Sequence, residues 1–436
     1  MENQDFISPY IPNTESDRRL MLETIGVEST EELFEDIPED HRNPTLSLPK
    51  PLSELDLSHN IKSLANQNAV PGDYSCFLGA GSYRHYIPAV VRQIVNRGEY
   101  MTSYTPYQPE IAQGTLQTTY EFQSLICQLT GMEVANAGMY DGATALAEGA
   151  LMSARLTGRK KIAVVDSVSP NYVEVLKTYS TGPSLTVCKV TSENPKLDSE
   201  TACLIVQQPN YTGYLENIEY LSETAHAYGA LLVVCCDPIY LGMFRSPAEF
   251  DADIIVGEGQ SLGISSSFGG PYVGIFTCKE KFLRQMPGRI VGKTVDTKGR
   301  TGYVLTLQTR EQHIRRERAT SNICTSVALI ALTATVWMAT LGKCGIKRIA
   351  ENCYHKSHYA ASLIKRIPGY SLPIEETFFR EFVVRCPTSP SSINEQLLNY
   401  GILGGLDINT LIPNGMLVCV TEMNSRDEID TFAKAL

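Results

Sequence analysis

Three tyrosines stand close together in the sequence YMTSYTPYQPEIAQGTLQ, which covers residues 100–117. Tyr100, Tyr104 and Tyr107 offer aromatic faces and hydroxyl groups, while Pro106 and Pro109 prevent regular secondary structure. A rigid loop of this kind is suited to lining a ligand pocket. For any single tyrosine, the alternative interpretation is a packed connector.

A second group with possible chemistry is a helix N-terminus at YDGAT, residues 140–144. Asp141 is predicted to be the N-cap of this helix. The small residues that follow leave the first backbone N–H groups accessible, and such groups bind phosphate at helix N-termini. By itself the signal is weak, because most capped helices bind no ligand.

Two further motifs resemble ligand sites without meeting their requirements. GRIVGKT, residues 288–294, has three residues between its glycines where a P-loop has four, and no apolar strand directly precedes it. Cys353, His355 and His358 have spacings that could bind a metal, but no fourth ligand accompanies them. We therefore predict neither a P-loop nor a metal site, and interpret the three residues as ordinary helix positions.

The stretch Asp251–Cys278 is predicted to form a strand, a glycine-rich turn and a second strand. Residues 253–256 supply the first apolar run and residues 272–276 the second, with Pro271 at the start of the second. The glycines between them let a backbone or a ligand approach closely. No Lys, Arg or His occurs from Ser246 to Cys278.

Composition restricts the classes of function that the chain can have. The 436 residues suggest two or three packed units, and 43% hydrophobic with 19% charged residues indicates a large buried core. A net charge of −11 argues against nucleic acid as a partner. The twelve cysteines form no CxxC pair, and MENQDFISPY has no signal-peptide pattern, so we expect a reduced, cytoplasmic location.

One segment has the length of a membrane span. Residues 325–342 carry no charge, but four Thr and one Ser interrupt them and Lys343 follows. We interpret this segment as a buried helix that crosses between domains, and expect no membrane association.

The periodicity of apolar residues predicts an alternation of strands and helices after residue 118. Such alternation indicates a mostly parallel sheet that is covered by helices on both faces. The expected strands are Lys161–Val165, Leu185–Val190, Cys203–Gln207, Leu231–Cys236, Asp253–Val256 and Tyr272–Phe276. We divide the chain into an extended and helical N-terminal arm (1–60), a large α/β domain (61–325), and a linking helix with a small C-terminal α+β domain (326–436).

Several phrases of the sequence, in order along the chain, resemble the P-protein family of the glycine cleavage system, and specifically its N-terminal-half subunit. They are GSYRHYIPAV, SYTPYQPEIAQGTLQ, ADIIVGEGQSLG, SFGGPY, GRIVGKTVDTKGRTGYVLTLQTREQHIRRERATSNICT and GLD near the end. The resemblance implies fold type I, the aspartate aminotransferase-like fold of pyridoxal phosphate (PLP)-dependent transferases. A large α/β domain followed by a small α+β domain agrees with that fold.

The resemblance also gives the gap in basic residues a meaning. In this fold an Asp pairs with the pyridine nitrogen of PLP, and a Lys after the next strand forms the Schiff base. Asp237 fits the first position, whereas Gln260 stands at the second, and an amide cannot form an imine. We expect this chain to bind no cofactor, with Asp237, Gln260 and Thr144 as relics. PLP would be bound covalently by glycine dehydrogenase subunit 2.

The family's reaction is the decarboxylation of glycine and transfer of the aminomethyl group to the lipoyl arm of H-protein. The resemblance implies a heterotetramer of two plus two chains, with the active site between unlike subunits. The residues expected to contribute polar contacts to it are His85, Tyr83, Tyr104, Tyr107 and Gln108. Ser169 stands where relatives commonly have His, which weakens a catalytic role for it.

Two alternatives remain open at this stage. The chain could be a self-sufficient PLP decarboxylase that uses Lys279 or Lys293, although both lie outside the glycine-rich turn. It could also be a purely structural partner of subunit 2. Between Lys281 and Arg318, ten basic residues face three acids; we interpret this as a solvated face or intersubunit ion pairs, with docking of an acidic partner as the alternative.

Overall fold

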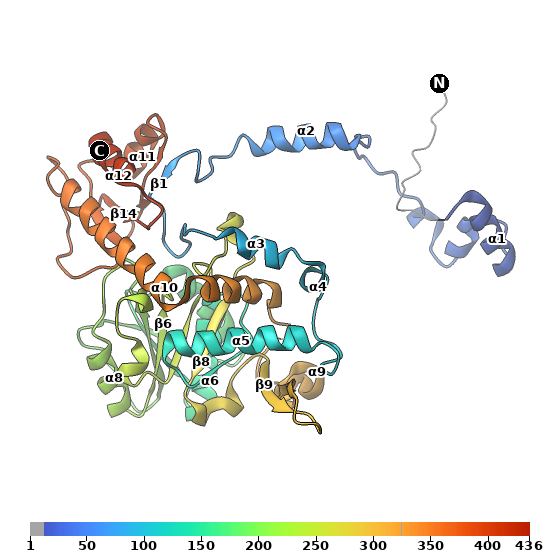
Figure 1. Ribbon diagram of the computed structural model, residues 1–436, viewed down its shortest axis with the longest axis horizontal. Helices are drawn as coiled ribbons and strands as arrows, with labels where there is room; N and C mark the ends of the chain where they lie inside the picture. Colours follow the sequence, from blue (N-terminus) through green and yellow to red (C-terminus); the bar gives the residue numbers. More distant parts are fainter. Residues whose placement is uncertain (1–12, 324) are drawn as a thin grey trace. The chain divides into compact units, whose positions relative to one another are not determined.

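The structure is a computed structural model that describes residues 13–323 and 325–436 (Figure 1). It divides the chain into two compact units, residues 1–68 and 69–436. Residue 60, where the sequence placed the end of the arm, lies inside helix α2 (Glu54–Ala65). The second unit contains both a large and a small lobe, each with its own hydrophobic core.

The N-terminal unit is built from short helices without a buried residue among those described. They are α1 (Glu15–Ile25), the 3-10 helices η1 (Thr30–Phe34) and η2 (Glu39–His41), and α2. Ser29 and Glu32 form a capping box, and the turn that they open is the 3-10 helix η1. Helix α1 was not predicted, although Thr14 and Asp17 form a second capping box before it.

A seven-stranded sheet forms the centre of the large lobe. Its order is β2 (Val134–Ala135), β8 (Gly274–Cys278), β7 (Ile254–Glu258), β6 (Leu231–Cys236), β5 (Thr201–Gln208), β3 (Lys161–Val165) and β4 (Thr186–Val190). β3 to β7 are parallel, with Val233 of β6 beside Ile254 of β7, while β8 and β2 are antiparallel to their neighbours. The mostly parallel sheet predicted from the sequence is confirmed.

β8 begins two residues later than the sequence predicted. Tyr272, which was assigned to the strand, belongs to the turn instead, because its hydroxyl donates to the Ser266 carbonyl oxygen at 2.7 Å. The antiparallel pairing then runs from Glu258 beside Gly274 to Ile254 beside Cys278. The turn therefore opens at the carboxyl end of β7.

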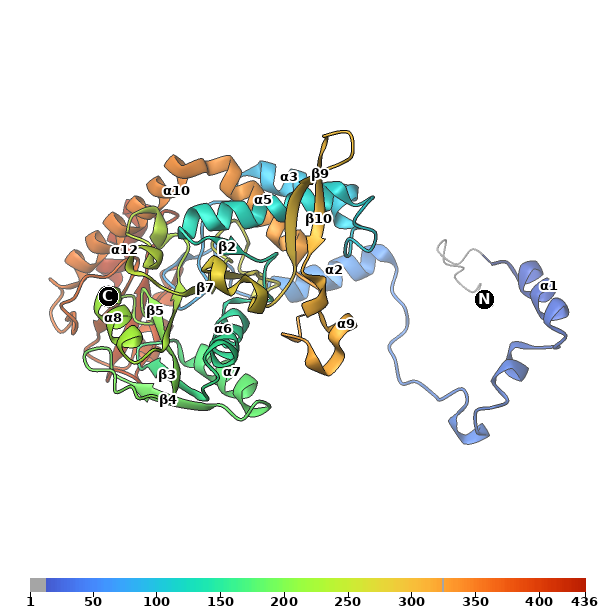
Figure 2. The same cartoon turned by 90° about the horizontal axis from the view of Figure 1, so that it is seen from below.

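Helices cover both faces of this sheet, with α5 and α10 on one side and α6 and α7 on the other (Figure 2). Gly131 ends α5 with φ 72°, in the left-handed conformation that glycine favours. The helices of the large lobe are α3 (Ala89–Val95), α4 (Gly98–Met101), α5 (Gln113–Thr130), α6 (Gly142–Thr157), α7 (Pro170–Thr181), α8 (Ile218–Ala227) and α9 (Gln312–Arg315). Short 3-10 helices are η3 (Tyr240–Gly242), η4 (Pro247–Phe250), η5 (Ser267–Gly269), η6 (Glu280–Gln285), η7 (Gln308–Arg310) and η8 (Arg316–Arg318).

Helix α10 (Ala328–Ile364) joins the two lobes as one kinked element. The sequence predicted a buried helix over residues 325–342, and α10 is kinked at the end of that segment, at Gly342 (φ 59°, ψ −176°). By length and composition α10 could cross a membrane. Trp337 is nevertheless buried, and its indole N–H donates to the Tyr86 carbonyl oxygen at 2.9 Å. In this fold α10 is a core helix.

The small lobe packs its own sheet against the second half of α10. This antiparallel sheet has the order β11 (Glu381–Arg385), β14 (Gly415–Cys419) and β13 (Leu406–Asp407), and the helices are α11 (Pro390–Leu398) and α12 (Arg426–Ala435). Two smaller pairings complete the unit, β1 (Ser75–Cys76) with β12 (Ile402–Leu403) and β9 (Ile290–Val295) with β10 (Thr301–Thr306). Residues 79–86 follow β1 and lead back to the large lobe.

Candidate active site

A cavity of about 50 Å³ lies at the carboxyl ends of β5, β6 and β7. Ligands of open α/β sheets bind at this edge, because loops from several strands converge there. Side chains from both lobes and from the 79–86 segment line this cavity. The polar side chains among them include Tyr83, Asp237, Glu258, Gln260, Arg380 and Glu381. Two of the three predicted relic positions, Asp237 and Gln260, therefore do meet in one cavity.

Gln260 is fixed in the turn after β7 by all of its amide atoms. Its Nε2 donates to the carbonyl oxygens of Tyr83 (2.9 Å) and Ile264 (2.7 Å), and its Oε1 accepts from the Tyr83 N–H (2.7 Å). The residue is 1% exposed. Gln260 thus ties the turn to the 79–86 segment and supplies no nucleophile.

The N-terminus of α6 holds a carboxyl group of the same chain. Glu258 accepts from the N–H of Gly142 (2.8 Å) with one oxygen and from the N–H of Gln260 (2.9 Å) with the other. Burial raises the pKa of Glu258 to about 8, although both backbone bonds oppose this. Asp141 caps α6 as predicted, and the Thr144 hydroxyl is bonded within that cap. The N–H groups of Gly142 and Thr144 at this helix N-terminus are therefore already bonded to carboxyl groups of this chain.

Asp237, at the end of β6, pairs with Arg380 of the small lobe. One carboxylate oxygen accepts from Arg380 Nη2 and the other from the N–H of Ile239 (2.8 Å). The Arg380 side chain is 2% exposed, and its guanidinium carbon lies 3.4 Å from the centre of the Tyr83 ring. Burial works to lower the pKa of Arg380, but the nearby acidic groups, Asp237 first among them, together outweigh it and raise that pKa. This is a buried, charged bond between the lobes.

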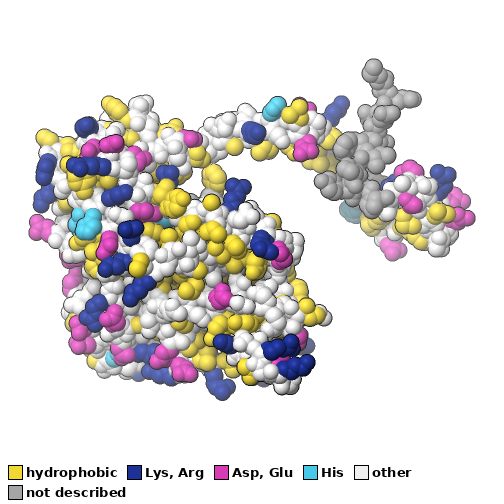
Figure 3. Space-filling model, in the orientation of Figure 1, with side chains coloured by type: hydrophobic (Ala, Val, Ile, Leu, Met, Phe, Trp, Pro, Cys, Tyr) yellow, Lys and Arg dark blue, Asp and Glu magenta, His cyan; other side chains and the backbone are white. Residues whose placement is uncertain are grey.

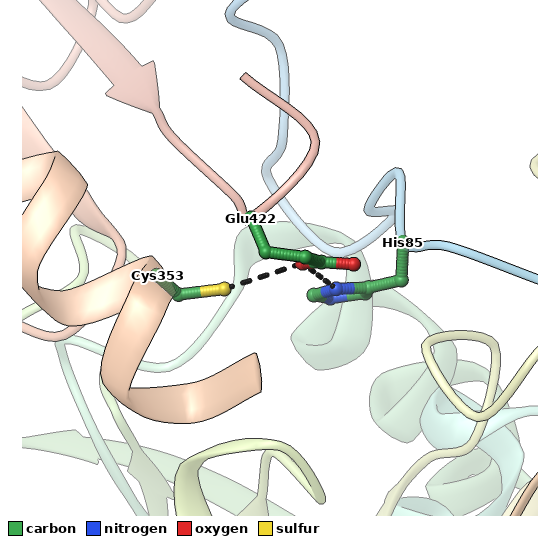
Figure 4. A group of neighbouring side chains, drawn as sticks. All are labelled: His85, Cys353 and Glu422. Atoms are coloured by element: carbon green, nitrogen blue, oxygen red, sulfur yellow. Dashed lines mark hydrogen bonds and ion pairs between the residues drawn. The ribbon is translucent and has the colours of Figure 1, made fainter. Parts of the chain in front are cut away.

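His85 extends this chain of bonds, with both ring nitrogens occupied; Figure 4 draws its contact with Glu422. Its Nε2 lies 2.6 Å from Arg380 Nη1, and its Nδ1 lies 2.7 Å from Glu422. Because a guanidinium has only donors, Nε2 must accept, so the proton is on Nδ1 and is donated to Glu422. His85 is 7% exposed. Its contacts are all within this chain.

Cys353 completes a cluster of three possible metal ligands with His85 and Glu422. Their donor atoms lie within 4.8 Å of one another, and the Cys353 sulfur lies 3.5 Å from Glu422 (Figure 4). Burial raises the pKa of the Cys353 thiol well above its ordinary value, which disfavours the thiolate that binds metals. Because the thiolate of Cys353 is disfavoured and the Nδ1 of His85 carries a proton, we interpret the three residues as a hydrogen-bonded chain. His355 and His358 are not in the cluster.

Tyr83 joins the same network through its hydroxyl, which donates to Glu381 at 2.7 Å. The other oxygen of Glu381 accepts from the N–H of Ala80 at 2.6 Å. Burial raises the pKa of both side chains. Glu381 therefore holds the 79–86 segment against the small lobe from a second point.

The other predicted site residues lie on the surface. Tyr104 and Tyr107 are 69% and 78% exposed, and Gln108 is also exposed. The two tyrosine rings lie 6.2 Å apart, centre to centre. Ser169, by contrast, is buried at the start of α7, and its N–H donates to Gln207 (2.8 Å).

The remaining basic candidates are far from the cavity in the fold. Lys279 follows β8 and so lies at the opposite end of β7 from Glu258, where its ammonium group bonds to Asp251 (2.7 Å) and Asp253 (2.8 Å). Lys293 is exposed on β9, within the hairpin that residues 288–294 help to form. Neither lysine lines the cavity.

Sequence reasoning missed four charged residues of the site: Glu258, Arg380, Glu381 and Glu422. Their partners lie far away along the chain; Arg380 and His85 are 295 residues apart. No local spacing marks such pairs. The only available signal was position, since Glu258 stands at the end of a strand on the edge where ligands bind.

Comparison with solved structures defines the class of protein. The chain is similar to a C-DES variant that carries glycine covalently linked to its PLP cofactor, with a TM-score of 0.60 and 14% identity over 86% of this chain and 98% of that one. At this identity the likeness concerns the fold alone. The chain has the fold of the PLP-dependent enzymes of fold type I, as the sequence predicted.

More similar proteins define the family. The model of the family described as glycine cleavage system P-protein matches residues 8–436. A relative from Desulforamulus reducens named probable glycine dehydrogenase (decarboxylating) subunit 1 is 51% identical, over 98% of this chain and 99% of its own length. A crystal structure of glycine decarboxylase (P-protein) in inhibitor-bound form matches with a TM-score of 0.93 and 39% identity, over 98% and 100%. The chain belongs to the glycine cleavage system P-protein family, which confirms the expectation from its sequence.

The residues of this chain's own cavity do not fit PLP. No lysine lines the cavity. The Gly142 N–H donates to Glu258, and the Asp237 carboxylate is already paired with Arg380. A bound cofactor would need an amine for its aldehyde, free donors for its phosphate and a free carboxylate for its ring nitrogen. All three requirements fail at the same place.

Proposed function

We propose that this chain is the cofactor-free half of a two-subunit glycine decarboxylase that works in the cytoplasm. Subunit 2 holds PLP, which serves as the electron sink when glycine loses carbon dioxide, and the aminomethyl group passes to the lipoyl arm of H-protein. The observation that carries the proposal is Gln260, buried and fully bonded in the glycine-rich turn. We infer a heterotetramer of two copies of each chain.

The surface of the second unit supports an obligate partner. Hydrophobic side chains gather on the face that carries α3 and α10 (Figure 3). The exposed apolar residues of the 86–111 segment include Tyr86 (57%) and Ile111 (79%), and Phe268 in the glycine-rich turn is 90% exposed. Phe268 also has φ 54°, a strained conformation for a residue with a side chain. Exposed apolar groups on this scale are typical of interaction sites.

Within this assembly the five predicted residues take two roles. Tyr104, Tyr107 and Gln108 are exposed and can reach a site that lies between the chains. His85 and Tyr83 are bonded inside this chain, so we assign them to positioning the segment that leads to the exposed loop. The basic residues near β9 and α9 remain candidates for intersubunit ion pairs.

Reconstitution tests the proposal. Each subunit alone should release no carbon dioxide from glycine in the presence of lipoylated H-protein, and the mixture should do so. Co-expression should raise the solubility of this chain and give one species that contains both, because obligate interfaces are large and apolar. Separate elution of the two chains at micromolar concentration would contradict the obligate complex.

The rival functions make different predictions in the same experiment. A self-sufficient decarboxylase would be active alone, yet Lys279 is held by two carboxylates at the far end of β8 and Lys293 lies on a hairpin. A purely structural partner would restore activity in the complex but would tolerate loss of every polar group in the 104–108 loop. Activity of the isolated chain would favour the first rival.

A further inference from the structure

Two of the side chains that line the cavity, Glu258 and Arg380, are bonded to other groups of this chain. The Glu258 carboxyl accepts a hydrogen bond from the N–H of Gly142, the first residue of α6. The Arg380 guanidinium forms an ion pair with the Asp237 carboxylate. Gln260 bonds to the backbone of Tyr83 on both sides of that residue's α-carbon.

The contact between Glu258 and α6 is close-packed. A β-carbon added at Gly142 would lie 2.9 Å from the β-carbon of Glu258 and 2.6 Å from the Tyr172 hydroxyl. Only glycine permits this approach. The Glu258 and Tyr172 side chains are therefore packed against Gly142, whose N–H is also bonded to Glu258.

The contact at Asp237 joins the two lobes. Arg380 comes from the residue before β11 in the small lobe and bonds to Asp237 after β6 and to His85 in the 79–86 segment. Its Nε, also buried, has no partner among the described residues. A guanidinium bonded in this way cannot be displaced without leaving a buried carboxylate unpaired.

We propose that Glu258, Gln260 and Arg380 form an internal plug that takes the place of cofactor and holds the lobes together. Glu258 binds the Gly142 N–H at the N-terminus of α6, Arg380 pairs with the carboxylate that would bond the ring nitrogen, and Gln260 fills the position of the imine-forming lysine. The plug excludes PLP even when a lysine is supplied, and it fixes residues 79–86 between the lobes. The inference rests on the proposed function only in assigning the cofactor to the partner.

The first test supplies the missing lysine. The full chain, alone and with subunit 2, is incubated with PLP, reduced with borohydride and mapped by peptide mass. Gln260→Lys should carry no phosphopyridoxyl group at position 260. Adding Glu258→Ser, which frees the Gly142 N–H, and Arg380→Met, which frees Asp237, should give label there. If the triple variant does not fold, labelling of the double variant Gln260→Lys/Glu258→Ser provides the test.

Each outcome of that test bears on the plug. Label at position 260 in the double or triple variant, but not in Gln260→Lys, supports it. Label in Gln260→Lys alone overturns it, because Glu258 and Arg380 would then exclude nothing. The absence of label in every variant that still binds subunit 2 also overturns it, because exclusion would have another cause.

The second test measures the tie between the lobes by hydrogen exchange. In Arg380→Met, amide exchange in residues 79–86 should accelerate by roughly a hundredfold, as expected when a buried ion pair loses one partner. Arg385→Met changes an exposed arginine on the same strand and should leave that segment unchanged. Arg380→Lys keeps the charge but not the fork that reaches Asp237 and His85 together, so a smaller acceleration is expected.

Equal exchange in Arg380→Met and Arg385→Met would overturn the tie. If Arg380→Met does not fold, amide exchange of residues 79–86 in Arg380→Lys is compared with Arg385→Met instead. Both tests are distinguishable from a failure of the proposed function, because neither measures glycine decarboxylation. Labelling at position 260 and amide exchange in residues 79–86 can therefore support or overturn the plug even if the reconstituted complex is inactive.

Discussion

At the scale of single residues, His85 and Tyr107 have opposite surroundings although both were expected to touch the shared active site. The His85 ring is enclosed by Arg380 and Glu422, and Tyr107 is 78% exposed. A side chain whose polar atoms are satisfied inside its own chain positions other groups. One that is exposed in the separate chain is free to bond a partner or a substrate.

Tyr107→Phe should reduce glycine decarboxylation without changing the stability of the chain. Loss of a hydrogen bond to a charged group costs about 1.5–3 kcal/mol, or roughly ten- to a hundredfold in rate. The measurement is turnover of the reconstituted complex with H-protein, at constant PLP content. Tyr400→Phe, another exposed tyrosine, serves as the control and should have no effect. Unchanged turnover in Tyr107→Phe would favour the structural partner.

His85→Phe should instead lower the free energy of unfolding. The substitution leaves Arg380 without one acceptor and Glu422 without a donor, and a buried polar group left unpaired costs about 1–3 kcal/mol. Urea unfolding of the isolated chain measures this, and His85→Gln, which can keep one of the bonds, should lose less. Full stability with lost turnover would mean that His85 acts in catalysis itself.

The hydrogen bond between His85 and Glu422 also predicts a pH dependence. Burial works to raise the pKa of Glu422, but the interaction with His85 and the backbone hydrogen bonds, from Tyr86 among others, together outweigh it and lower that pKa overall. A carboxyl with a lowered pKa in the folded state stabilises it above the ordinary value of about 4.3, and this contribution is lost as the pH falls through the lowered pKa. Glu422→Gln should therefore flatten the decline of unfolding free energy in acid. Parallel pH profiles would contradict the role given to this bond.

At the scale of elements, the sequence predicted those parts whose cause is local. Apolar β-branched runs gave the parallel strands, and β6 has the predicted bounds because its run ends at a polar residue, Asp237. The predicted helix over residues 325–342 ends where α10 is kinked, because Gly342 interrupts the helical pattern. The Asp237–Arg380–His85–Glu422 chain has no local cause. Only the packing of the small lobe on the sheet brings these residues together.

The kink in α10 allows a test of backbone conformation. Gly342 has φ 59° and ψ −176°, a region that is essentially open to glycine alone, so Gly342→Ala should cost about 1–3 kcal/mol. Gly182→Ala is the matched control, because Gly182 has helical angles (φ −59°) with open space around it and should be neutral or slightly stabilising. Denaturant unfolding compares the two. Equal effects would mean that the kink is not held by Gly342.

At the scale of the whole molecule, the chain keeps the architecture of a PLP enzyme while its own cavity is closed to PLP. The fold presents the 104–108 loop and Phe268 to the outside. The buried chain from Asp237 to Glu422 fixes the segment that leads to that loop. Under the proposed function, such a chain would contribute shape and polar groups to chemistry that takes place on subunit 2.

The location of the cofactor in the assembled enzyme tests this account most directly. The complex of this chain with subunit 2 is reduced with borohydride, and the mass of each chain and of its peptides is measured. We predict that subunit 2 gains one phosphopyridoxyl group per chain, while this chain gains none in Asp251–Cys278 or at Lys279. A stoichiometric label at either place in this chain would contradict the assignment of the cofactor to the partner.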